Sequence, residues 1–469
     1  MLILVLESST SSVKAMVYCS KQGVLAVRTM PYVPKYADAS MQDAEEIFLQ
    51  LTSLGKEICL GRKIDMIALS GALHSVMLCD RDMVPLTPVY QWSFTGAKDL
   101  CKNLRQNQEY VNRFYQKTGC MVNAIYPAFK LKYLQQKGYD LTKCLVMGQS
   151  TYNTFRLTGE RMIMDSIASG TGLMNIHTKE FDTEILAEIG IDESQLSKIV
   201  TYKDTGSLDE FGASQLGLSA GIPVIPAGSD AGLNQVTAPN GVMTFSVGTS
   251  GALRMSSPNP VIPSTPSTWC YLSPKSWMIG AATSGCCNCV DWVKTRMLPT
   301  GTTFSDIEKD LSQVENTPVF LPFLFGERCP GWQDDRSAGF LDIKPPHKAL
   351  DFYHSVLEGT LYNLYQCFKV MVEINGMPRK ILLSGGILHS EYWTQMCADI
   401  FNMEMEAADM EHSSLLGAAA LAMELGGVIS DASDFNVEIA RRIIPDPKMH
   451  ESYMLKFKRY LELYEENAT

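Results

Sequence analysis

Apolar and polar positions repeat one pattern in two segments that lie about half a chain apart. Residues 2–18 run apolar, polar and apolar again, and the second apolar stretch carries one cation, Lys14. Residues 243–255 follow the same order, with Arg254 as the cation. Turns rich in Gly, Ser and Thr between β-compatible runs predict two β-hairpins.

Elsewhere the hydrophobic periodicity alternates short strands with helices in both halves of the chain. Helices are predicted over residues 43–58, 130–137, 152–157, 350–374, 393–401 and 414–425. Buried strands are predicted over residues 64–70, 76–79, 221–227 and 380–383. This alternation predicts an α/β protein of two domains.

The boundary between these domains is expected between about residues 231 and 245, because this region separates the two repeats. We therefore assign residues 1–236 to an N-terminal domain and residues 237–469 to a C-terminal domain. No Pro-rich linker or low-complexity stretch separates them. The two domains are expected to pack closely around a central cleft.

Each predicted hairpin turn offers backbone N–H groups and hydroxyls to an anion. The first turn contains Thr10 and Ser11, and the second contains Gly248, Thr249 and Ser250. With one turn in each domain, the two would hold the phosphates of one nucleotide from opposite sides. Two unrelated surface hairpins are the alternative, and for either turn taken alone that alternative is favoured.

Asp230 is the candidate catalytic base. It follows the apolar strand over residues 221–227 and has small neighbours, which leaves its carboxylate room to face a ligand. Ligands gather at the carboxyl ends of strands in open α/β sheets. Phosphoryl transfer uses a carboxylate there to accept the proton of the acceptor hydroxyl. A helix-capping Asp is the alternative, with equal weight.

Glu7 stands at a similar strand end, beside the first turn. A carboxylate next to bound phosphates suits Mg²⁺, either directly or through water, so Glu7 and Asp230 are the candidate metal ligands. Glu7 as a turn-stabilising acid is the alternative. Lys14 and Arg254 are candidate contacts to phosphate oxygens, although solvated cations at strand edges are more frequent.

Three further groups of residues are candidates for a binding or metal site. Gly385 and Gly386 follow a predicted strand and would let the backbone approach a flat ligand such as adenine. His74 is a candidate contact to a substrate hydroxyl, with a buried, satisfied His as the alternative. The cluster Cys286-Cys287-x-Cys289 lacks nearby partner ligands, so we interpret it as structural or pocket-lining thiols rather than a metal site.

The amino-acid composition disfavours several classes of protein. The 469 residues carry a net charge of −11 and 46% are apolar, which disfavours nucleic-acid binding and disorder. The 13 Cys residues are otherwise scattered, and neither a signal peptide nor a membrane-spanning stretch is recognised. A reducing cytoplasm with free thiols is expected. The absence of G-x-x-x-x-G-K-[ST] and G-x-G-x-x-G motifs excludes P-loop and protein-kinase interpretations.

Taken together, these segments resemble the FGGY carbohydrate kinases, a branch of the actin, hexokinase and Hsp70 ATPase superfamily. The resemblance covers almost the whole chain in the family's order. Its motifs lie at residues 9–15, 70–75, 229–230, 246–251, 320–330, 383–401 and 416–419. It implies two actin/hexokinase-like (ribonuclease H-like) domains, ATP and Mg²⁺ as cofactors, and an adenosine region around Gly385 and Gly386. It also places Trp92, with His74, in the substrate pocket.

Within the family the chain looks most like gluconokinases, on the segments 72–76, 248–254, 357–359 and 362–365. Several positions depart from the family pattern. The first motif reads Glu7-Ser8-Ser9-Thr10 instead of Asp-x-Gly-Thr, and the acid and Arg that usually follow Trp92 are missing. The gluconokinase-like stretches at 123–127 and 284–288 are also altered. The ATP machinery is therefore expected to be kept, and the preferred sugar to differ.

The leading hypothesis is an ATP-dependent kinase for a small sugar or sugar acid, with gluconate as the first candidate. A xylulokinase-like enzyme for a ketopentose or polyol is the alternative within the class. A catalytically weak sensor of sugar or nucleotide is the alternative of another class, and an Hsp70-like chaperone is disfavoured because the acceptor-pocket segments are present. A homodimer is kept as a candidate assembly.

Overall fold

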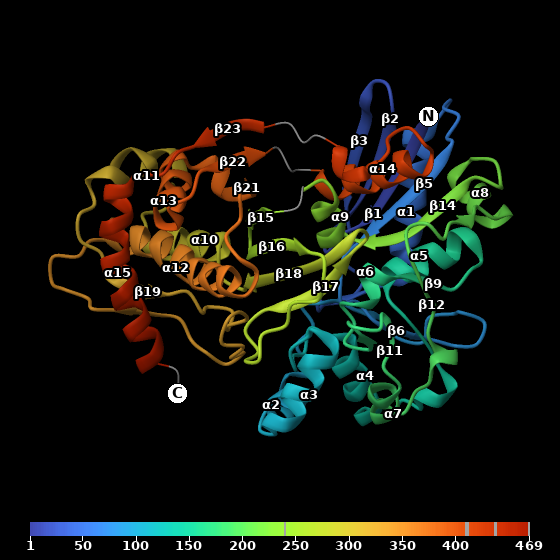
Figure 1. Cartoon of the computed structure of the whole chain (residues 1–469), viewed down its shortest axis with the longest axis horizontal. Coiled ribbons are helices and arrows are strands. Elements are labelled where there is room, and N and C mark those ends of the chain that lie inside the picture. Colours follow the sequence, from blue (N-terminus) through green and yellow to red (C-terminus); the bar gives the residue numbers. More distant parts are fainter. Residues whose placement is uncertain (239–240, 409–411, 436–438, 468–469) are drawn as a thin grey trace.

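Two β-sheets covered by helices form the two halves of the molecule (Figure 1). The computed structural model describes residues 1–238, 241–408, 412–435 and 439–467. Residues 239–240, inside the region where the sequence predicts the domain boundary, lie outside the described residues, as do the C-terminal residues 468–469.

The sheet of the N-terminal half has six strands in the order β13-β14-β5-β1-β2-β3. These strands are β1 (Leu2–Ser8), β2 (Ser12–Cys19), β3 (Gly23–Pro31), β5 (Met66–Gly71), β13 (Gly206–Ser207) and β14 (Pro223–Ser229). The hairpin predicted over residues 2–18 is confirmed, because β1 and β2 pair antiparallel with Glu7 opposite Lys14. β1 also pairs parallel with β5.

The sheet of the C-terminal half has seven strands in the order β17-β18-β16-β15-β21-β22-β23. These strands are β15 (Val242–Val247), β16 (Gly251–Ser257), β17 (Trp269–Ser273), β18 (Ser276–Thr283), β21 (Lys380–Ser384), β22 (Met405–Ala408) and β23 (Ile439–Ile443). The second hairpin is confirmed by the antiparallel pairing of β15 with β16. β15 pairs parallel with β21, as β1 does with β5.

The two sheets therefore share one strand topology. In each, an antiparallel hairpin is extended on one side by a further antiparallel strand, and on the other side by two parallel strands. The same topology places the two hairpin turns at equivalent positions, one in each half. The repeat seen in the sequence is thus a repeat of structure.

β1 is apolar from Leu2 to Leu6 because both of its faces are covered. Leu4 and Leu6 pack in one cluster with residues of α1 (Ala44–Cys59). Ile3 and Val5 point to the opposite face and pack in another cluster with α14 (Ser413–Leu425). Strands covered on both faces lose the apolar and polar alternation of half-exposed strands.

Helix α14 comes from the end of the chain yet packs on the N-terminal sheet (Figure 1). Its small residues allow a close approach to α9 (Asp230–Val236): a Cβ added at Gly417 would lie 2.1 Å from the carbonyl oxygen of Leu233. The helix predicted at 414–425 is confirmed, and its packing ties the last third of the chain to the first. The domain boundary at 236/237 stays a prediction.

The remaining helices surround these sheets. They are α2 (Lys98–Leu104), α3 (Gln108–Thr118), α4 (Pro127–Gln136), α5 (Gln149–Thr158), α6 (Asp165–Ala168), α7 (Thr183–Ile189), α8 (Glu210–Leu216), α10 (Cys287–Met297), α11 (Phe304–Asp310), α12 (Ala349–Asn375), α13 (Glu391–Phe401) and α15 (Pro447–Glu466). Short 3₁₀ helices are η1 (Leu141–Lys143), η2 (Glu193–Gln195), η3 (Leu311–Gln313), η4 (Gly386–His389) and η5 (Ala432–Asp434).

Ten short strands form five small two-stranded sheets. They are β4 (Met41–Gln42), β6 (Met77–Cys79), β7 (Val89–Tyr90), β8 (Leu145–Met147), β9 (Met162–Met164), β10 (Met174–Asn175), β11 (Glu180–Phe181), β12 (Lys198–Val200), β19 (Val319–Leu321) and β20 (Gly339–Leu341). Most of them lie in the N-terminal half, between the strands of its main sheet.

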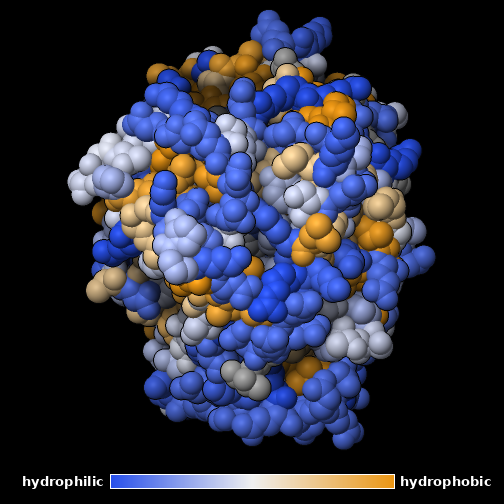
Figure 2. All heavy atoms as spheres, turned by 90° about the vertical axis from the view of Figure 1, so that its left-hand side faces the viewer, coloured by the Kyte–Doolittle hydropathy of each residue, from blue (hydrophilic) through white to orange (hydrophobic). Residues whose placement is uncertain are grey.

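The outer face of the C-terminal half is mainly hydrophilic, with hydrophobic side chains in small separate groups (Figure 2). Among the described helices, none is both long and apolar enough to cross a membrane.

Candidate active site

The turn between β1 and β2 is closed by Ser9. Its N–H donates to the carbonyl oxygen of Ser12 (2.9 Å), and its hydroxyl donates to the same oxygen (2.8 Å). Serine therefore replaces the Gly expected here and adds a hydrogen bond to the turn. Thr10 and Ser11 form the tip, where Thr10 is partly buried and Ser11 is exposed.

Hydrogen bonds link Thr10 to the neighbouring loop that carries Trp92. The indole N–H of Trp92 donates to the Thr10 hydroxyl (3.0 Å), and Gln42 donates to the Thr10 carbonyl oxygen (2.8 Å). Gln91 donates in turn to the side chain of Gln42 (2.6 Å). The predicted phosphate turn and the predicted substrate residue are therefore directly connected.

Glu7 is buried and joins three distant segments. Its Oε1 pairs with Lys14 Nζ at 2.9 Å. Its Oε2 accepts hydrogen bonds from the hydroxyls of Ser70 (2.7 Å) and of Ser414 on α14. Lys14 thus lies beside a carboxylate at the base of the turn, and the buried acid is satisfied by polar partners, as a buried charge requires.

Asp230 stands where β14 passes into α9. It is not the helix cap, because the Ser229 hydroxyl takes that role by accepting from the N–H of Gly232 (3.1 Å). The Asp230 carboxylate accepts from the N–H of Ala231 (2.7 Å). Its carboxylate is thus held at the end of a central strand and remains available to a ligand.

The pKa of Asp230 is raised to about 6. Burial is the largest cause, followed by the negative charge of Glu7. The N–H of Ala231 and the cations Arg254 and Lys14 act in the opposite direction. Charged side chains of both hairpins therefore act on Asp230, and its pKa suits a proton acceptor near neutral pH.

The turn between β15 and β16 is held by the start of α10. The N–H of Gly248 donates to the carbonyl oxygen of Ser250 (3.1 Å), and the carbonyl oxygen of Gly248 accepts from the N–H of Cys287 (2.9 Å). The Thr249 carbonyl oxygen accepts from the N–H of Asn288 (3.4 Å). The turn thus rests on the first residues of a helix.

Gly385 and Gly386 lie against this second turn. Gly385 has φ +98°, and a Cβ there would lie 2.5 Å from the carbonyl oxygen of Val247. Only glycine combines that backbone conformation with so close an approach. The predicted adenine-side glycines and the predicted phosphate turn are therefore neighbours in the structure.

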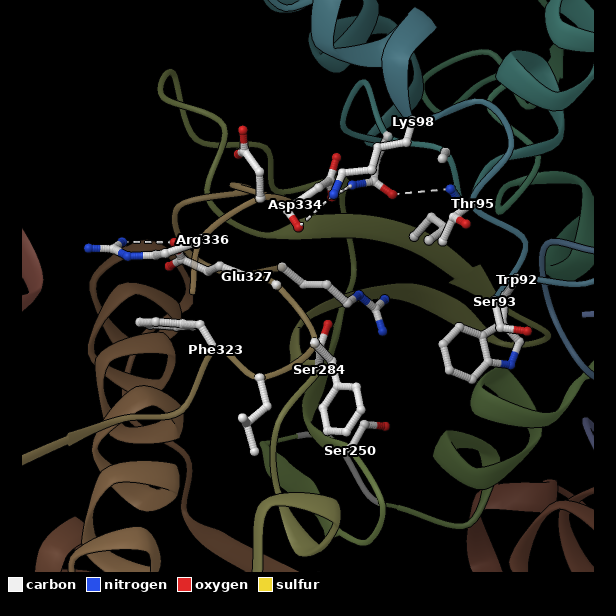
Figure 3. A pocket seen from close by; sticks show the side chains of 18 of the residues that line it. Trp92, Ser93, Thr95, Lys98, Ser250, Ser284, Phe323, Glu327, Asp334 and Arg336 are labelled. Atoms are coloured by element: carbon white, nitrogen blue, oxygen red, sulfur yellow. Dashed lines mark hydrogen bonds and ion pairs between the residues drawn. The ribbon is translucent and has the colours of Figure 1, made fainter. Parts of the chain in front are cut away.

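A cavity of about 1030 Å³ opens beside the turns (Figure 3). Figure 3 shows Trp92 and Ser93 on one side, Phe323 on the other, and Ser250 and Ser284 between them. Its lining comprises Trp92 to Thr95, Lys98, Asn123 to Ile125, Thr249, Ser250, Ser284, Asn288, Phe323 to Arg328 and Asp334 to Ala338. The predicted residues Trp92, Thr249 and Ser250 line it directly.

Arg328 supplies a positive charge to this cavity. Among the described residues, no carboxylate forms an ion pair with it, and its Nε is buried without a hydrogen-bond partner. The acids nearby are paired elsewhere, since Asp334 bonds Arg105 (2.8 Å) and Glu327 bonds Arg336 (2.9 Å). The lining therefore presents a cation with unused donors, which suits an anionic group.

His74 lies behind the cavity and does not line it. Its Nδ1 bonds the carbonyl oxygen of Gly170 (2.6 Å), and its ring packs edge-on against Tyr126 and Tyr271. Burial lowers the pKa of His74 to about 3, so the ring is neutral. Because a carbonyl only accepts, Nδ1 carries the proton and Nε2 is left as an acceptor.

Lys130 is completely buried on α4 and connects the loop that carries His74 to the loop that carries Trp92. Its Nζ donates to the carbonyl oxygens of His74 (2.7 Å) and Gln91 (2.7 Å). Burial holds the pKa of Lys130 well below its usual range. His74 itself has φ +67°, an uncommon conformation for a residue with a side chain.

Sequence comparison identifies the family. Residues 2–237 match the FGGY family of carbohydrate kinases, N-terminal domain, and residues 243–424 match its C-terminal domain. The chain belongs to the FGGY family of carbohydrate kinases. The kinase class predicted from the sequence is therefore confirmed, and ATP is implied as a substrate.

Similar proteins carry two substrate names. A gluconokinase of Bacillus subtilis (strain 168) is 27% identical over 451 residues, covering 90% of this chain and 87% of that protein. A xylulose kinase of Staphylococcus xylosus is 23% identical and covers 98% of this chain and 99% of that protein.

Solved structures agree with the fold. A gluconate kinase from Lactobacillus acidophilus superposes with a TM-score of 0.94 at 25% identity, covering 100% of this chain and 99% of that one. A xylulose kinase from Lactobacillus acidophilus gives 0.95 at 25% identity, covering 100% and 98%. The predicted two-domain α/β fold is confirmed.

The carboxylates of this carbohydrate kinase fit the Mg²⁺ that accompanies ATP in kinases. Glu7 and Asp230 are near enough for the charge of Glu7 to act on Asp230. Asp230 is the better placed for direct contact, because both oxygens of Glu7 already have partners. In the described part of the chain, no group of three or more His, Cys, Asp or Glu residues could hold a metal, so phosphate oxygens and waters would complete the coordination.

Several residues of the candidate site were not assigned a role from the sequence. Arg328 lies in a family-like Gly-Glu-Arg stretch, which was the one available signal. The sequence around Lys130 and Ser414 gave no signal of a role, because their contacts join segments that are 39 to 407 residues apart. Asn123, in an altered stretch, donates to Asp334 (2.8 Å) across the cavity wall.

Proposed function

We propose that this carbohydrate kinase transfers the γ-phosphoryl group of ATP to a hydroxyl of a small sugar acid, with gluconate as the first candidate. The observation that carries the proposal is that Asp230 directly follows β14, where charged side chains of both hairpins act on it and its pKa is raised to about 6. A base there accepts the proton of the acceptor hydroxyl as that oxygen attacks phosphorus.

The ATP loops are proposed from the same geometry. Thr10, Ser11 and Lys14 would bind phosphate oxygens from the N-terminal half, and Gly248, Thr249 and Ser250 from the C-terminal half. Gly385 and Gly386 would approach the adenosine. Mg²⁺, held by Asp230 and through water by Glu7, would neutralise phosphate charge. Closure of the two halves would exclude water, which competes as acceptor.

The acceptor would bind in the cavity that Trp92 lines. The unpaired guanidinium of Arg328 favours a carboxylate-bearing sugar over a neutral one, because Arg binds carboxylates through two parallel hydrogen bonds. His74 does not line this cavity, so its predicted effect on the sugar would be indirect, through the Lys130 bonds that join its loop to the Trp92 loop. A ketopentose such as xylulose is the second candidate, supported by the TM-score of 0.95 to a xylulose kinase.

The test is ADP formation with saturating Mg²⁺–ATP against a panel of aldonates, ketopentoses and polyols. We expect gluconate or a close relative to stimulate turnover most. Arg328→Gln should raise the KM for an aldonate more than for a neutral sugar, since only the acid loses its charge partner. If ATP binds and no sugar stimulates turnover, the sensor hypothesis replaces the kinase hypothesis.

The cytoplasmic location and the homodimer predicted from the sequence remain proposals. Size-exclusion chromatography with light scattering at several protein concentrations tests the homodimer.

A further inference from the structure

Three thiols meet at the start of α10. Cys286 and Cys289 are buried, whereas Cys287, the first residue of the helix, is partly exposed. All 13 cysteines are free, and Cys19 is the one other cysteine that is not fully buried. Cys287 and Cys19 are therefore the two cysteines that are partly exposed to solvent.

Cys287 lies between the two loops assigned above to ATP. Its N–H donates to the carbonyl oxygen of Gly248 (2.9 Å), and its Sγ lies 3.6 Å from the carbonyl oxygen of Val247. A Cβ built on Gly386 would lie 3.1 Å from the same Sγ. The thiol thus occupies the contact between the second turn and the glycine pair.

The surroundings of Cys287 favour the thiolate. A hydrogen bond with the Cys286 thiol is the largest cause that lowers the pKa of Cys287, and burial and Asp291 oppose it. The pKa of the Cys286 thiol is raised instead, so Cys287 is the reactive member of the pair. Cys19 also has a lowered pKa, chiefly because of a backbone hydrogen bond from Lys21.

We propose that Cys287 is a thiol-modification site, at which a low-molecular-weight disulfide forms a mixed disulfide that closes the nucleotide site. The proposal rests on the assignment of residues 248–250 and 385–386 to ATP. In the reaction the Cys287 thiolate attacks one sulfur of R–S–S–R, a new S–S bond forms, and the second sulfur leaves as the thiolate R–S⁻. A reducing thiol reverses it.

The geometry explains why an adduct excludes ATP. The sulfur lies 3.6 Å from the carbonyl oxygen of Val247 and within 3.1 Å of the place where a Cβ of residue 386 would stand, so an added group has little free space between the two loops. Cys287 cannot withdraw without breaking its hydrogen bond to Gly248, which supports the turn. The group must therefore enter the space of the nucleotide or push the two loops apart.

The experiment treats the full-length protein with bis(2-hydroxyethyl) disulfide and follows it by intact-mass and peptide mass spectrometry. ATP affinity is measured by calorimetry without sugar, before treatment, after treatment and after reduction with dithiothreitol. We expect adducts at Cys287 and Cys19, ATP affinity weakened by about tenfold or more, and recovery on reduction. Bound Mg²⁺–ATP should slow modification of Cys287 and leave that of Cys19 unchanged.

Two variants distinguish the effect of modifying Cys287 from that of modifying Cys19. The ATP affinity of each treated variant is compared with that of the same variant after reduction. Cys19→Ser should still lose ATP affinity on treatment, whereas Cys287→Ser should keep it although Cys19 is modified. If Cys287→Ser does not fold, the adduct stoichiometry and the Cys19→Ser variant still give the answer.

Three results would overturn the proposal. One is an adduct at Cys287 with unchanged ATP affinity, and another is a loss of affinity that follows modification of Cys19. The third is a native protein in which Cys19 reacts and Cys287 does not. Failure of the reduced, untreated protein to bind ATP would instead contradict the proposed function itself, and the modification proposal with it.

Discussion

The charge environment of Asp230 is the residue-scale feature on which its proposed role as the base depends. Burial and Glu7 raise its pKa, and Arg254 and Lys14 limit the rise. A base must be deprotonated to accept a proton, and a pKa of about 6 leaves most Asp230 charged at neutral pH while keeping it more basic than an exposed Asp.

This environment predicts the pH dependence of the reaction. kcat/KM should fall on the acid side with an apparent pKa near 6. Glu7→Gln should move that limb to lower pH, because removing a neighbouring negative charge stabilises the carboxylate of Asp230. Initial rates at low acceptor concentration, from about pH 5 to 8, provide the measurement. An acid limb unchanged in Glu7→Gln would contradict the coupling.

At the scale of elements, a buried lysine holds together the two loops that we propose to bind the acceptor. Lys130 on α4 bonds one carbonyl in the His74 loop and one in the Trp92 loop. The Trp92 loop in turn bonds Thr10 in the first turn. Acceptor loops and phosphate turn therefore form one hydrogen-bonded unit, which suits the fixed geometry that phosphoryl transfer needs.

Lys130→Met should misplace both acceptor loops and leave the second turn intact. We expect the KM of the sugar to rise about tenfold to a hundredfold, with little change in ATP affinity. Lys137→Met, an exposed lysine after the same helix, is the matched control and should match the parent protein. Equal loss of ATP and sugar affinity in Lys130→Met would indicate a general structural role instead.

The contact between η4 and the second turn gives another prediction. Gly385→Ala places a side chain at φ +98° and 2.5 Å from a carbonyl oxygen, so the loops must separate. ATP affinity should fall about tenfold or more. Gly427→Ala tests backbone strain alone, because it has φ +67° with open space around it. If both variants bind ATP equally well, the contact does not shape the nucleotide site.

Much of the element pattern could be predicted from the sequence. The long helix α12 and the strand β14 carry strong periodicity and fall within two residues of their predicted ends. Helix α4 begins three residues earlier than predicted, at Pro127, because Pro at the first helical position supports a helix start that hydrophobic periodicity does not reveal. Helix α3 was not predicted, although its four buried residues, at positions 111, 114, 115 and 118, follow the spacing of one helix face.

The candidate site was predicted in its parts and not in its connections. Strand ends, turn residues and family resemblance pointed to Asp230, Trp92 and both turns, and their functional roles stay predictions. Helix α14 packs on the N-terminal sheet, and the hydroxyl of Ser414 donates to Glu7. Both contacts join segments that are distant in the sequence. No local pattern encodes such packing.

At the scale of the whole molecule, the two sheets share a core topology, and each contributes a hairpin whose charged side chains act on Asp230. The protein is acidic overall, with a net charge of −11, yet the cavity beside the turns contains an unpaired Arg328. Local cations in an acidic protein direct anionic ligands to the cavity rather than to the surface at large.

The central claim is that Asp230 is the base for ATP-dependent phosphorylation of a sugar hydroxyl. The direct test is the steady-state rate of Asp230→Asn with the best acceptor from the panel, together with its ATP affinity by calorimetry. Asn keeps the size of the side chain and removes its basicity, so kcat should fall by about 10² to 10⁴ while ATP affinity stays nearly constant. Near-normal turnover by Asp230→Asn would contradict the claim.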